Sequence, residues 1–425
     1  MTDLIESRIK AIKEGKLPEG YKRTKAGIMP VDWDGTIQAK KLFKKHTDKK
    51  HDGDLEILAA TQERGIVPRS QIGIDIQCSD EGVKGYKKVS KGDFVISLRS
   101  FQGGIEYSEY TGIISPAYTV LKPIKDISTG FYRNYFKTDT FIKRLNGAVY
   151  GIRDGKQIGY EDFGNMYVHC PPLAEQERIA EILIQCDRVI ELKEKKLDEL
   201  KQLKKEFLRK MFPAKGCDTP EIRFPGFTGA WEQRKLIDVC DYVDYRGKTP
   251  TKTDSGNFLV TAKNIKDGYI DYETSQEYIS EDDYEETMHR GKPEIGDVLI
   301  TTEAPCGNVA QVNKENIALA QRIIKYRGHR NLIANTYLKY YLLSPEFQNI
   351  LNAKSSGGTV KGIKGSILHQ QIIKYPKYEE QVKIGQDLNA INNLITLHQR
   401  ELEETKKYKK SLARLLLTGI VRVKE

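Results

Sequence analysis

The chain has 425 residues, which is longer than one average domain and indicates two or more. Hydrophobic residues make up 39% of it, enough for globular cores, but no apolar run approaches the roughly 20 residues that span a bilayer. The formal net charge of +10 favours a polyanionic partner such as nucleic acid. We therefore expect no membrane segment, and DNA or RNA is the first partner to consider.

Neither the first residues nor the cysteines indicate secretion. The opening stretch, MTDLIESRIKAIKEGK, is charged throughout and lacks the apolar block of a secretory signal. The six cysteines show no C-x-x-C or other metal-ligand spacing, so we interpret them as reduced thiols. These features predict a cytoplasmic protein without a metal site.

In chain order, each half of the sequence predicts an α+β domain followed by one long helix. Gly-Asp turns lead into the β-rich runs GDFVIS (92–97) and GDVLIT (296–301), and aromatic and leucine residues at helical spacing follow in both halves. A glycine-rich loop then precedes each long helix. The predicted boundaries are 1–28 for an N-terminal segment, 29–170 for the first domain, 171–217 for its helix, 218–372 for the second domain and 373–425 for the last helix.

The two halves predict a tandem duplication. The stretches PPLAEQERIAEIL (171–183) and YPKYEEQVKIGQDL (375–388) both run from a proline through a Glu-Gln pair into an apolar helical pattern. The offset stays between 204 and 206 residues as the match extends upstream to KGDFVIS (91–97) and IGDVLIT (295–301). Each half also carries its single tryptophan near its start. A constant offset predicts an internal repeat with pseudo-two-fold symmetry.

Both long helices carry a 3-4 apolar pattern over four heptads, which is typical of coiled coils. We expect the two helices to run antiparallel and to separate the two domains like a spacer about 57 Å long. Pro213 and Gly419 are natural helix ends. Polar seam residues such as Lys193, Lys204 and Lys409 either fix the register or extend their ends to water. The predicted apolar seam comprises Leu183, Ile190, Leu197, Leu200, Phe207, Leu388, Ile391, Ile395, Leu402 and Leu412.

The sequence lacks the short motifs of the common DNA-modifying enzymes. It contains no phosphate-binding G-x-x-x-x-G-K-[ST], no H-E-x-x-H, and no Asn-Pro-Pro-Tyr or Asp-Pro-Pro-Tyr. Asp297 and Glu303 resemble a nuclease carboxylate pair, but Pro305 stands where such a site needs a lysine. We interpret Asp297 as a turn residue and Glu303 as a surface residue. The chain is therefore predicted to bind rather than to catalyse.

Loops rich in Arg, Lys, Gln and Asn are the candidates for DNA contact. Arginine and lysine bind phosphates or guanine edges, and glutamine and asparagine pair with adenine. The candidate residues are Arg69, Arg99, Gln102, Arg153, Lys156 and Gln157 in the first half, and Tyr245, Arg246, Lys248, Thr249, Lys252, Lys263, Asn264, Lys361 and Lys364 in the second.

With these features together, the chain resembles the specificity subunit of type I restriction-modification systems. The resemblance rests on the paired Pro…Glu-Gln…Ile helices, on MPVDW and RFPGFTGAWEQRKL, and on RGKTP, TAKNIKDGYID and GDVLITTEAP. It implies two target recognition domains that each read one half of a bipartite DNA sequence, with the coiled coil setting the unread gap. Because the halves differ outside the repeat, the target should be asymmetric.

The resemblance also implies partners. Two methylase subunits would bring S-adenosylmethionine and flip the target adenine, and restriction subunits that translocate DNA would use ATP and magnesium. The Glu-Gln pairs would lie where domain, coil and methylase meet. Two alternatives remain open: a specificity subunit for a fused methylase-nuclease partner (type IIB-like), and a coiled-coil scaffold that does not read DNA. A self-contained nuclease or methyltransferase is disfavoured by the missing motifs.

Overall fold

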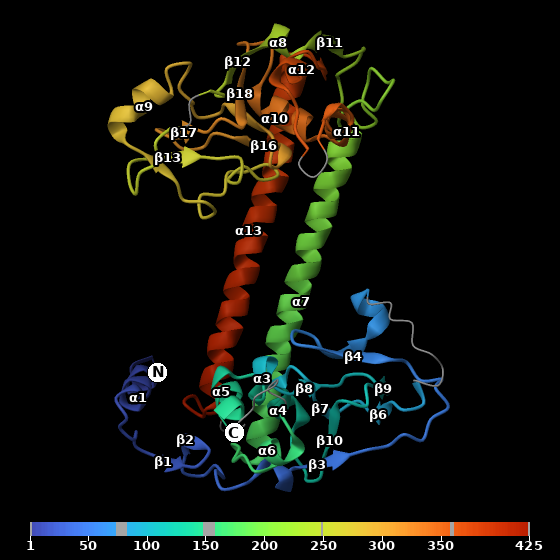
Figure 1. Ribbon diagram of the computed structural model, residues 1–425, viewed down its shortest axis with the longest axis vertical. Helices are drawn as coiled ribbons and strands as arrows, with labels where there is room; N and C mark the ends of the chain where they lie inside the picture. Colours follow the sequence, from blue (N-terminus) through green and yellow to red (C-terminus); the bar gives the residue numbers. More distant parts are fainter. Residues whose placement is uncertain (1, 74–82, 148–157, 248–249, 358–360, 424–425) are drawn as a thin grey trace. The chain divides into compact units, whose positions relative to one another are not determined.

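The computed structural model describes residues 2–73, 83–147, 158–247, 250–357 and 361–423 (Figure 1). The chain divides into two compact units, unit 1 with Met1–Leu192 and Leu402–Glu425, and unit 2 with Lys193–Glu401. The two long helices, α7 (Leu173–Lys210) and α13 (Tyr378–Leu417), each contribute to both units. These units are cut within the helices, so the domain boundaries placed at the helix starts stay predictions.

Unit 1 is a mixed α and β structure. In chain order before α7 it contains α1 (Thr2–Lys13), β1 (Tyr21–Thr24), β2 (Gly27–Pro30), η1 (Ala39–Lys41), β3 (Phe43–His46), β4 (Leu58–Thr61), β5 (Gly65–Pro68), η2 (Arg69–Ile72), β6 (Lys87–Val89), β7 (Phe94–Ile96), α3 (Ser100–Gly103), β8 (Glu106–Tyr107), β9 (Gly112–Ile114), β10 (Thr119–Pro123), α4 (Thr129–Tyr135), α5 (Asp139–Gly147) and α6 (Tyr160–Gly164).

The main sheet of unit 1 is antiparallel, with the strand order β3-β10-β7-β8. Its register pairs Val120 with His46 and Thr119 with Ile96. The ends of β3 and β7 and the start of β10 therefore lie at one edge of the sheet. Aromatic rings pack beside the sheet, and Phe43 alone contacts four of them at centroid distances of 5.3 to 6.0 Å.

Unit 2 has a similar content. Between α7 and α13 it contains β11 (Glu232–Lys235), α8 (Leu236–Val239), β12 (Cys240–Asp244), β13 (Asn257–Val260), β14 (Tyr278–Ile279), α9 (Glu281–Thr287), β15 (Val298–Thr302), β16 (Cys306–Gln311), β17 (Ala318–Leu319), β18 (Ile323–Gly328), α10 (Asn335–Leu343), α11 (Pro345–Lys354), α12 (Gly365–His369) and β19 (Ile372–Tyr375).

The main sheet of unit 2 repeats the plan of unit 1. Its strand order is β12-β18-β15-β16, again antiparallel, and β15 follows the second Gly-Asp turn as β7 follows the first. Pairing of Asp244 with Ile324 and of Thr301 with Ile323 places the ends of β12 and β15 and the start of β18 at one edge. The same connectivity in both units confirms the predicted tandem α+β repeat.

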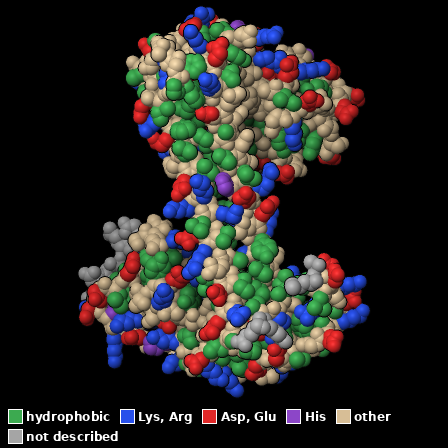
Figure 2. All heavy atoms as spheres, turned by 180° about the vertical axis from the view of Figure 1, so that it is seen from behind, with side chains coloured by type: hydrophobic (Ala, Val, Ile, Leu, Met, Phe, Trp, Pro, Cys, Tyr) green, Lys and Arg blue, Asp and Glu red, His purple; other side chains and the backbone are tan. Residues whose placement is uncertain are grey.

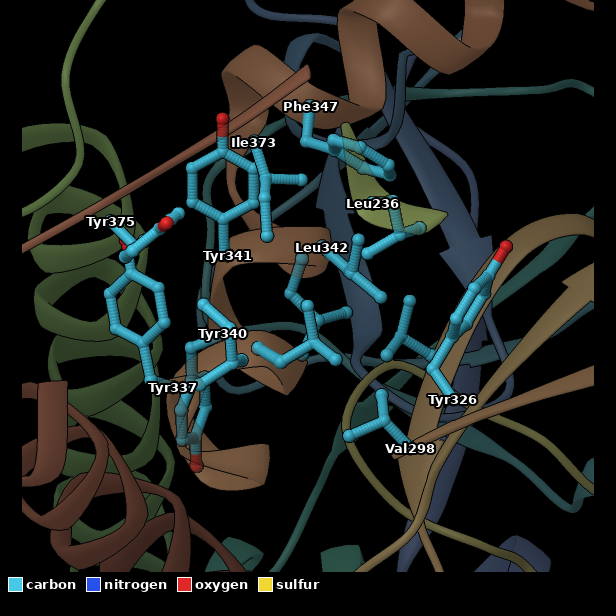
Figure 3. Packing of buried hydrophobic residues seen from close by; sticks show 14 of the residues in the cluster. Leu236, Val298, Tyr326, Tyr337, Tyr340, Tyr341, Leu342, Phe347, Ile373 and Tyr375 are labelled. Atoms are coloured by element: carbon cyan, nitrogen blue, oxygen red, sulfur yellow. The ribbon is translucent and has the colours of Figure 1, made fainter. Parts of the chain in front are cut away.

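The helix α10 packs on this sheet and contributes several of the largest buried side chains of unit 2 (Figure 1). Tyr337, Leu338, Tyr340 and Leu342 are fully buried in it. Figure 3 shows Tyr337 beside Tyr375 at the end of β19, with Leu236, Val298 and Tyr326 on the opposite side of the same cluster. Burial of so many large side chains accounts for the stability of this half.

The Gly-Asp turns have the same chemistry in both units. The buried carboxylate of Asp93 accepts a hydrogen bond from the backbone N–H of Ser90 at 2.8 Å, and that of Asp297 accepts one from Glu294 at 2.9 Å. Asp297 also binds Arg327, whose Nε lies 2.6 Å from its Oδ1. Asp297 is thus a turn residue, as we interpreted it from the sequence.

The Glu-Gln pairs are buried at the starts of the long helices. Gln176 accepts a hydrogen bond from the N–H of Ser128 at 3.0 Å and donates to the carbonyl of Pro171 at 2.8 Å. Gln381 makes the equivalent bonds, with Ala334 and Pro376, both at 2.9 Å. Each glutamine thereby joins the first turn of a long helix to its α+β domain.

Each glutamate of these pairs binds a half-buried arginine. Glu175 accepts from Nε and Nη2 of Arg422 at 2.7 and 2.8 Å and from the indole of Trp33 at 2.8 Å. Glu380 accepts from Nε and Nη2 of Arg223 at 2.8 and 2.9 Å. Acidic residues in a first turn also suit the helix dipole. The structure adds a bidentate ion pair that the sequence did not reveal.

Within each unit the two long helices contact one another through polar pairs. Lys409 pairs with Asp187 in unit 1, and in unit 2 Lys193 lies 2.8 Å from Glu401 and Lys204 lies 3.0 Å from Asn392. The two pairs of unit 2 run in opposite sequence order, so the helices are antiparallel there. All ten predicted apolar seam residues are buried or half-buried.

Candidate nucleic-acid interface

Three candidate residues of unit 2, Arg246, Lys361 and Lys364, gather at the sheet edge formed by the ends of β12 and β15 and the start of β18. Arg246 follows β12, Arg322 precedes β18, and the loop with Lys361 and Lys364 closes over the turn after β15. The N–H of Ile363 donates to Thr302 at 2.9 Å and thereby fixes this loop to the strand. Antiparallel pairing therefore brings together loops that are more than 100 residues apart in sequence.

The basic side chains at this edge are exposed but held in place. Arg246 is 44% exposed, and its Nε lies 3.0 and 3.2 Å from the carboxylate oxygens of Asp244. A Cβ at Gly365 would come within 2.7 Å of the Arg246 guanidinium, so the glycine permits the loop to pack against it. Arg322, which the sequence analysis missed, pairs with Glu303 at 3.1 Å. Such partly paired arginines suit phosphate or guanine contact.

Other candidates of unit 2 have different surroundings. Tyr245 is buried, and its hydroxyl donates to the carbonyl of Gly291, while burial raises the pKa of its phenol. Lys252 pairs with Glu277 at 2.7 Å, and Lys263 is exposed. Asn264 is fully buried, and its side chain bonds the backbone of its own loop on both sides. Asn264 therefore stabilises its own loop, and its buried amide is not available to contact a base.

The equivalent edge of unit 1 has the same character. Arg99 and Gln102 follow β7, and the exposed Lys49 and Lys50 follow β3. Arg69 begins η2 directly after β5, and its guanidinium donates to the Tyr86 hydroxyl at 3.2 Å and lies over that ring. Arg153, Lys156 and Gln157, like Lys248 and Thr249 of the second half, lie outside the described residues.

On the face seen in Figure 2, acidic and basic side chains are mixed. Figure 2 shows Lys and Arg side chains interspersed with Asp and Glu over the visible face of each unit. The described parts of the chain hold no group of three His, Cys, Asp or Glu side chains placed to bind a metal ion. In the same residues, no helix is both long enough and apolar enough to cross a membrane. The candidate surface therefore consists of polar loops at one sheet edge in each unit.

Comparison with known families matches two segments of the chain, residues 35–202 and 229–407, to the type I restriction modification DNA specificity domain. The two matches cover more than half of the chain and fall on the two halves of the repeat. Each match extends from an α+β domain into the long helix that follows it.

Similar proteins match over most of the chain. The type I restriction enzyme MjaVIII specificity subunit of Methanocaldococcus jannaschii is 28% identical over 350 residues, covering 79% of this chain and 80% of that protein. The putative type I restriction enzyme MjaX specificity subunit of the same organism is 24% identical, covering 96% of this chain and 97% of that protein.

A solved structure has a similar fold. It comes from work on the complex assembly and conformational transition of the type I R-M system, and it superposes with a TM-score of 0.55 at 18% identity. The superposition covers 96% of this chain and 100% of that chain. At this identity the likeness establishes the fold alone.

Proposed function

This chain belongs to the type I restriction modification DNA specificity family, and we propose that its two α+β halves each read one part of a bipartite, asymmetric DNA target. DNA sequence recognition is the role of the family. The structural observation that carries the bipartite reading is the repeated sheet edge. In both units, basic side chains follow the strands at the same edge of an antiparallel sheet with the same strand order.

The asymmetry follows from the residues at that edge. Unit 1 presents Arg99 and Gln102 there, whereas unit 2 presents Arg246, Arg322 and Lys364. Glutamine and arginine recognise different bases in the major groove, adenine and guanine respectively. The two half-sites should therefore differ in sequence.

We assign to α7 and α13 the role of a coiled-coil spacer that sets the unread gap. Support comes from their lengths of 38 and 40 residues, their apolar seams, and the polar pairs between them in each unit. A helix of that length extends about 57–60 Å, enough to span more than one turn of B-DNA.

In this proposal, partner proteins in the cytoplasm carry out the catalysis. Two methylase subunits, using S-adenosylmethionine, would dock at the equivalent helix starts around Glu175 and Glu380. The internal repeat supports two such sites, because it presents the same Glu-Gln-Arg arrangement twice. Restriction subunits would supply the translocation and cleavage that need ATP and magnesium.

The test is DNA binding and methyl transfer with purified components. The chain with its genomically neighbouring methylase should bind duplex DNA with an affinity that falls steeply between 50 and 200 mM salt, by roughly 10³-fold if six phosphates are contacted. The chain alone should transfer no methyl group from S-adenosylmethionine. Binding that ignores both salt and sequence would favour the scaffold, and methyl transfer by the chain alone would contradict the proposal.

A further inference from the structure

Two exposed glutamines of unit 1 lie side by side although 40 residues separate them. Gln62 stands in the turn between β4 and β5, and Gln102 lies in the short helix α3 after β7. The Nε2 of Gln62 donates to the Oε1 of Gln102 at 3.4 Å, at the long end for a hydrogen bond. This contact joins the β4–β5 turn to the sheet edge that carries Arg99.

A lysine beneath the two loops fixes their distance. The Nζ of Lys137 donates to the backbone carbonyls of Gln62 at 3.2 Å and Gly103 at 2.8 Å, and it forms an ion pair with the buried Glu106 at 2.5 Å. One ammonium group thus satisfies three acceptors from three segments. Because Lys137 binds the backbone of both loops, the loops are held together independently of the contact between their glutamine side chains.

The glycine next to Gln102 is required for the same approach. A Cβ at Gly103 would lie 2.8 Å from Cγ of Gln62, closer than packed carbon atoms come. The Gln62 side chain therefore lies directly over the backbone of α3. Any larger residue at 103 would push it away from Gln102.

We infer that Gln62 and Gln102 form one reading element for an A·T base pair in the half-site of unit 1, with Lys137 and Gly103 as positioning residues. Adenine offers the N7 acceptor and the N6 amino donor in the major groove, and a glutamine amide matches both. After its bond to Gln102, Gln62 retains one N–H and its carbonyl oxygen for this pairing. Gln102 retains both N–H groups for an acceptor on the neighbouring base pair.

This inference rests on the proposed function and is tested on the assembled complex with its methylase. The readout is the methylated motif determined on a plasmid library with randomised half-sites. Gln62→Ala should reduce discrimination at one A·T position of one half-site by about tenfold. Gly103→Ala should relax the same position while retaining both glutamines, and the other half-site should not change. Gln185→Ala, an exposed glutamine on α7, is the matched control.

The outcomes separate the two claims. A wild-type complex without a bipartite motif would contradict the proposed function itself. A normal wild-type motif with no A·T pair in the responding half-site would overturn the reading element. The reading element would also be overturned if the variants kept the wild-type preference at every position of the motif, or if they lowered methylation equally at all sites. Lys137→Met is a second positioning variant, and rescue of the motif by Lys137→Arg would confirm that a cation is needed there.

Discussion

Two buried glutamates, each paired with a half-buried arginine, occupy equivalent places in the two units. Glu175 is 6% exposed and Glu380 is fully buried, and each receives two hydrogen bonds from one guanidinium. Arg422 comes from the segment after α13, and Arg223 from the segment after α7. Water cannot solvate a carboxylate that is buried in this way. Removal of the arginine therefore leaves an uncompensated buried charge, which destabilises the fold.

Arg422→Ala is therefore expected to destabilise unit 1 by about 3–5 kcal/mol, because it leaves Glu175 buried and uncompensated. Urea unfolding followed by the fluorescence of Trp33, in a Trp231→Phe background, measures this unit alone. Lys410→Ala breaks the exposed pair with Asp139 and should change the free energy of unfolding by less than about 1 kcal/mol. Equal effects of the two substitutions would contradict the account.

Glu106 predicts a pH dependence in the same unit. Burial raises the pKa of its carboxyl to about 7, against the lowering effect of Lys137. The folded state therefore binds the proton more tightly than the unfolded chain does. The resulting stabilisation is complete below the ordinary pKa of 4.5 and is lost as the pH rises through 7.

We expect the difference in unfolding free energy between the wild type and Glu106→Gln to fall from pH 4.5 to pH 8. The variant cannot take up the proton, so the comparison isolates this carboxyl from other titrating groups. The same Trp33 signal measures it. A difference that rises with pH, or stays constant, would show that Glu106 is ionised at low pH through its pairing with Lys137.

At the scale of elements, the helix pair carries an asymmetry between its two copies. Lys204 and Lys409 are equivalent in the repeat, but the first meets Asn392 and the second meets Asp187. Burial lowers the pKa of the Lys204 ammonium, which has an amide rather than a carboxylate as its contact on α13. The Lys204–Asn392 contact of unit 2 therefore lacks the attraction between opposite charges that the Lys409–Asp187 pair of unit 1 has.

Asn392→Asp should stabilise unit 2 by up to about 1 kcal/mol, since it gives Lys204 the carboxylate that Lys409 already has. Asn393→Asp, one position further and exposed, is the matched control and should have little effect. Urea unfolding followed by Trp231 in a Trp33→Phe background provides the measurement. Equal effects of the two substitutions would mean that the helix contact contributes nothing specific.

The elements themselves were largely predictable from the sequence, because periodicity and repetition are local signals. The constant offset and the 3-4 pattern predicted two α+β domains and two long helices, and the Gly-Asp turns predicted β7 and β15. The partners of buried polar groups were not predictable. Arg422 lies 247 residues from Glu175, and nothing in either segment indicates the other.

The site was predictable only as a set of loops. Arg246, Lys361 and Lys364 were each selected as loop cations, and antiparallel pairing then brought them to one edge. Asn264 was selected for its residue type alone, yet its amide serves the backbone of its own turn. Gln62 was not singled out, because its pairing depends on a glycine and a lysine from other segments.

At the scale of the whole molecule, the spacer role of the helices predicts a change of target. Deleting residues 196–202 from α7 and 394–400 from α13 removes one heptad from each while keeping the pairs Lys193–Glu401 and Lys204–Asn392. The helices shorten by about 10 Å, so the unread gap should shrink by up to about three base pairs. Deletion from one helix alone should prevent assembly. An unchanged gap in the double deletion would refute the spacer role.

The most direct test of the central claim is a map of modified adenines. The chain would be co-expressed with its neighbouring methylase, and methylation would be recorded across the host genome. We predict one motif of two short, different half-sites around a gap of fixed length. A continuous motif, or no modification despite an assembled complex, would contradict the claim that both halves of this chain read DNA.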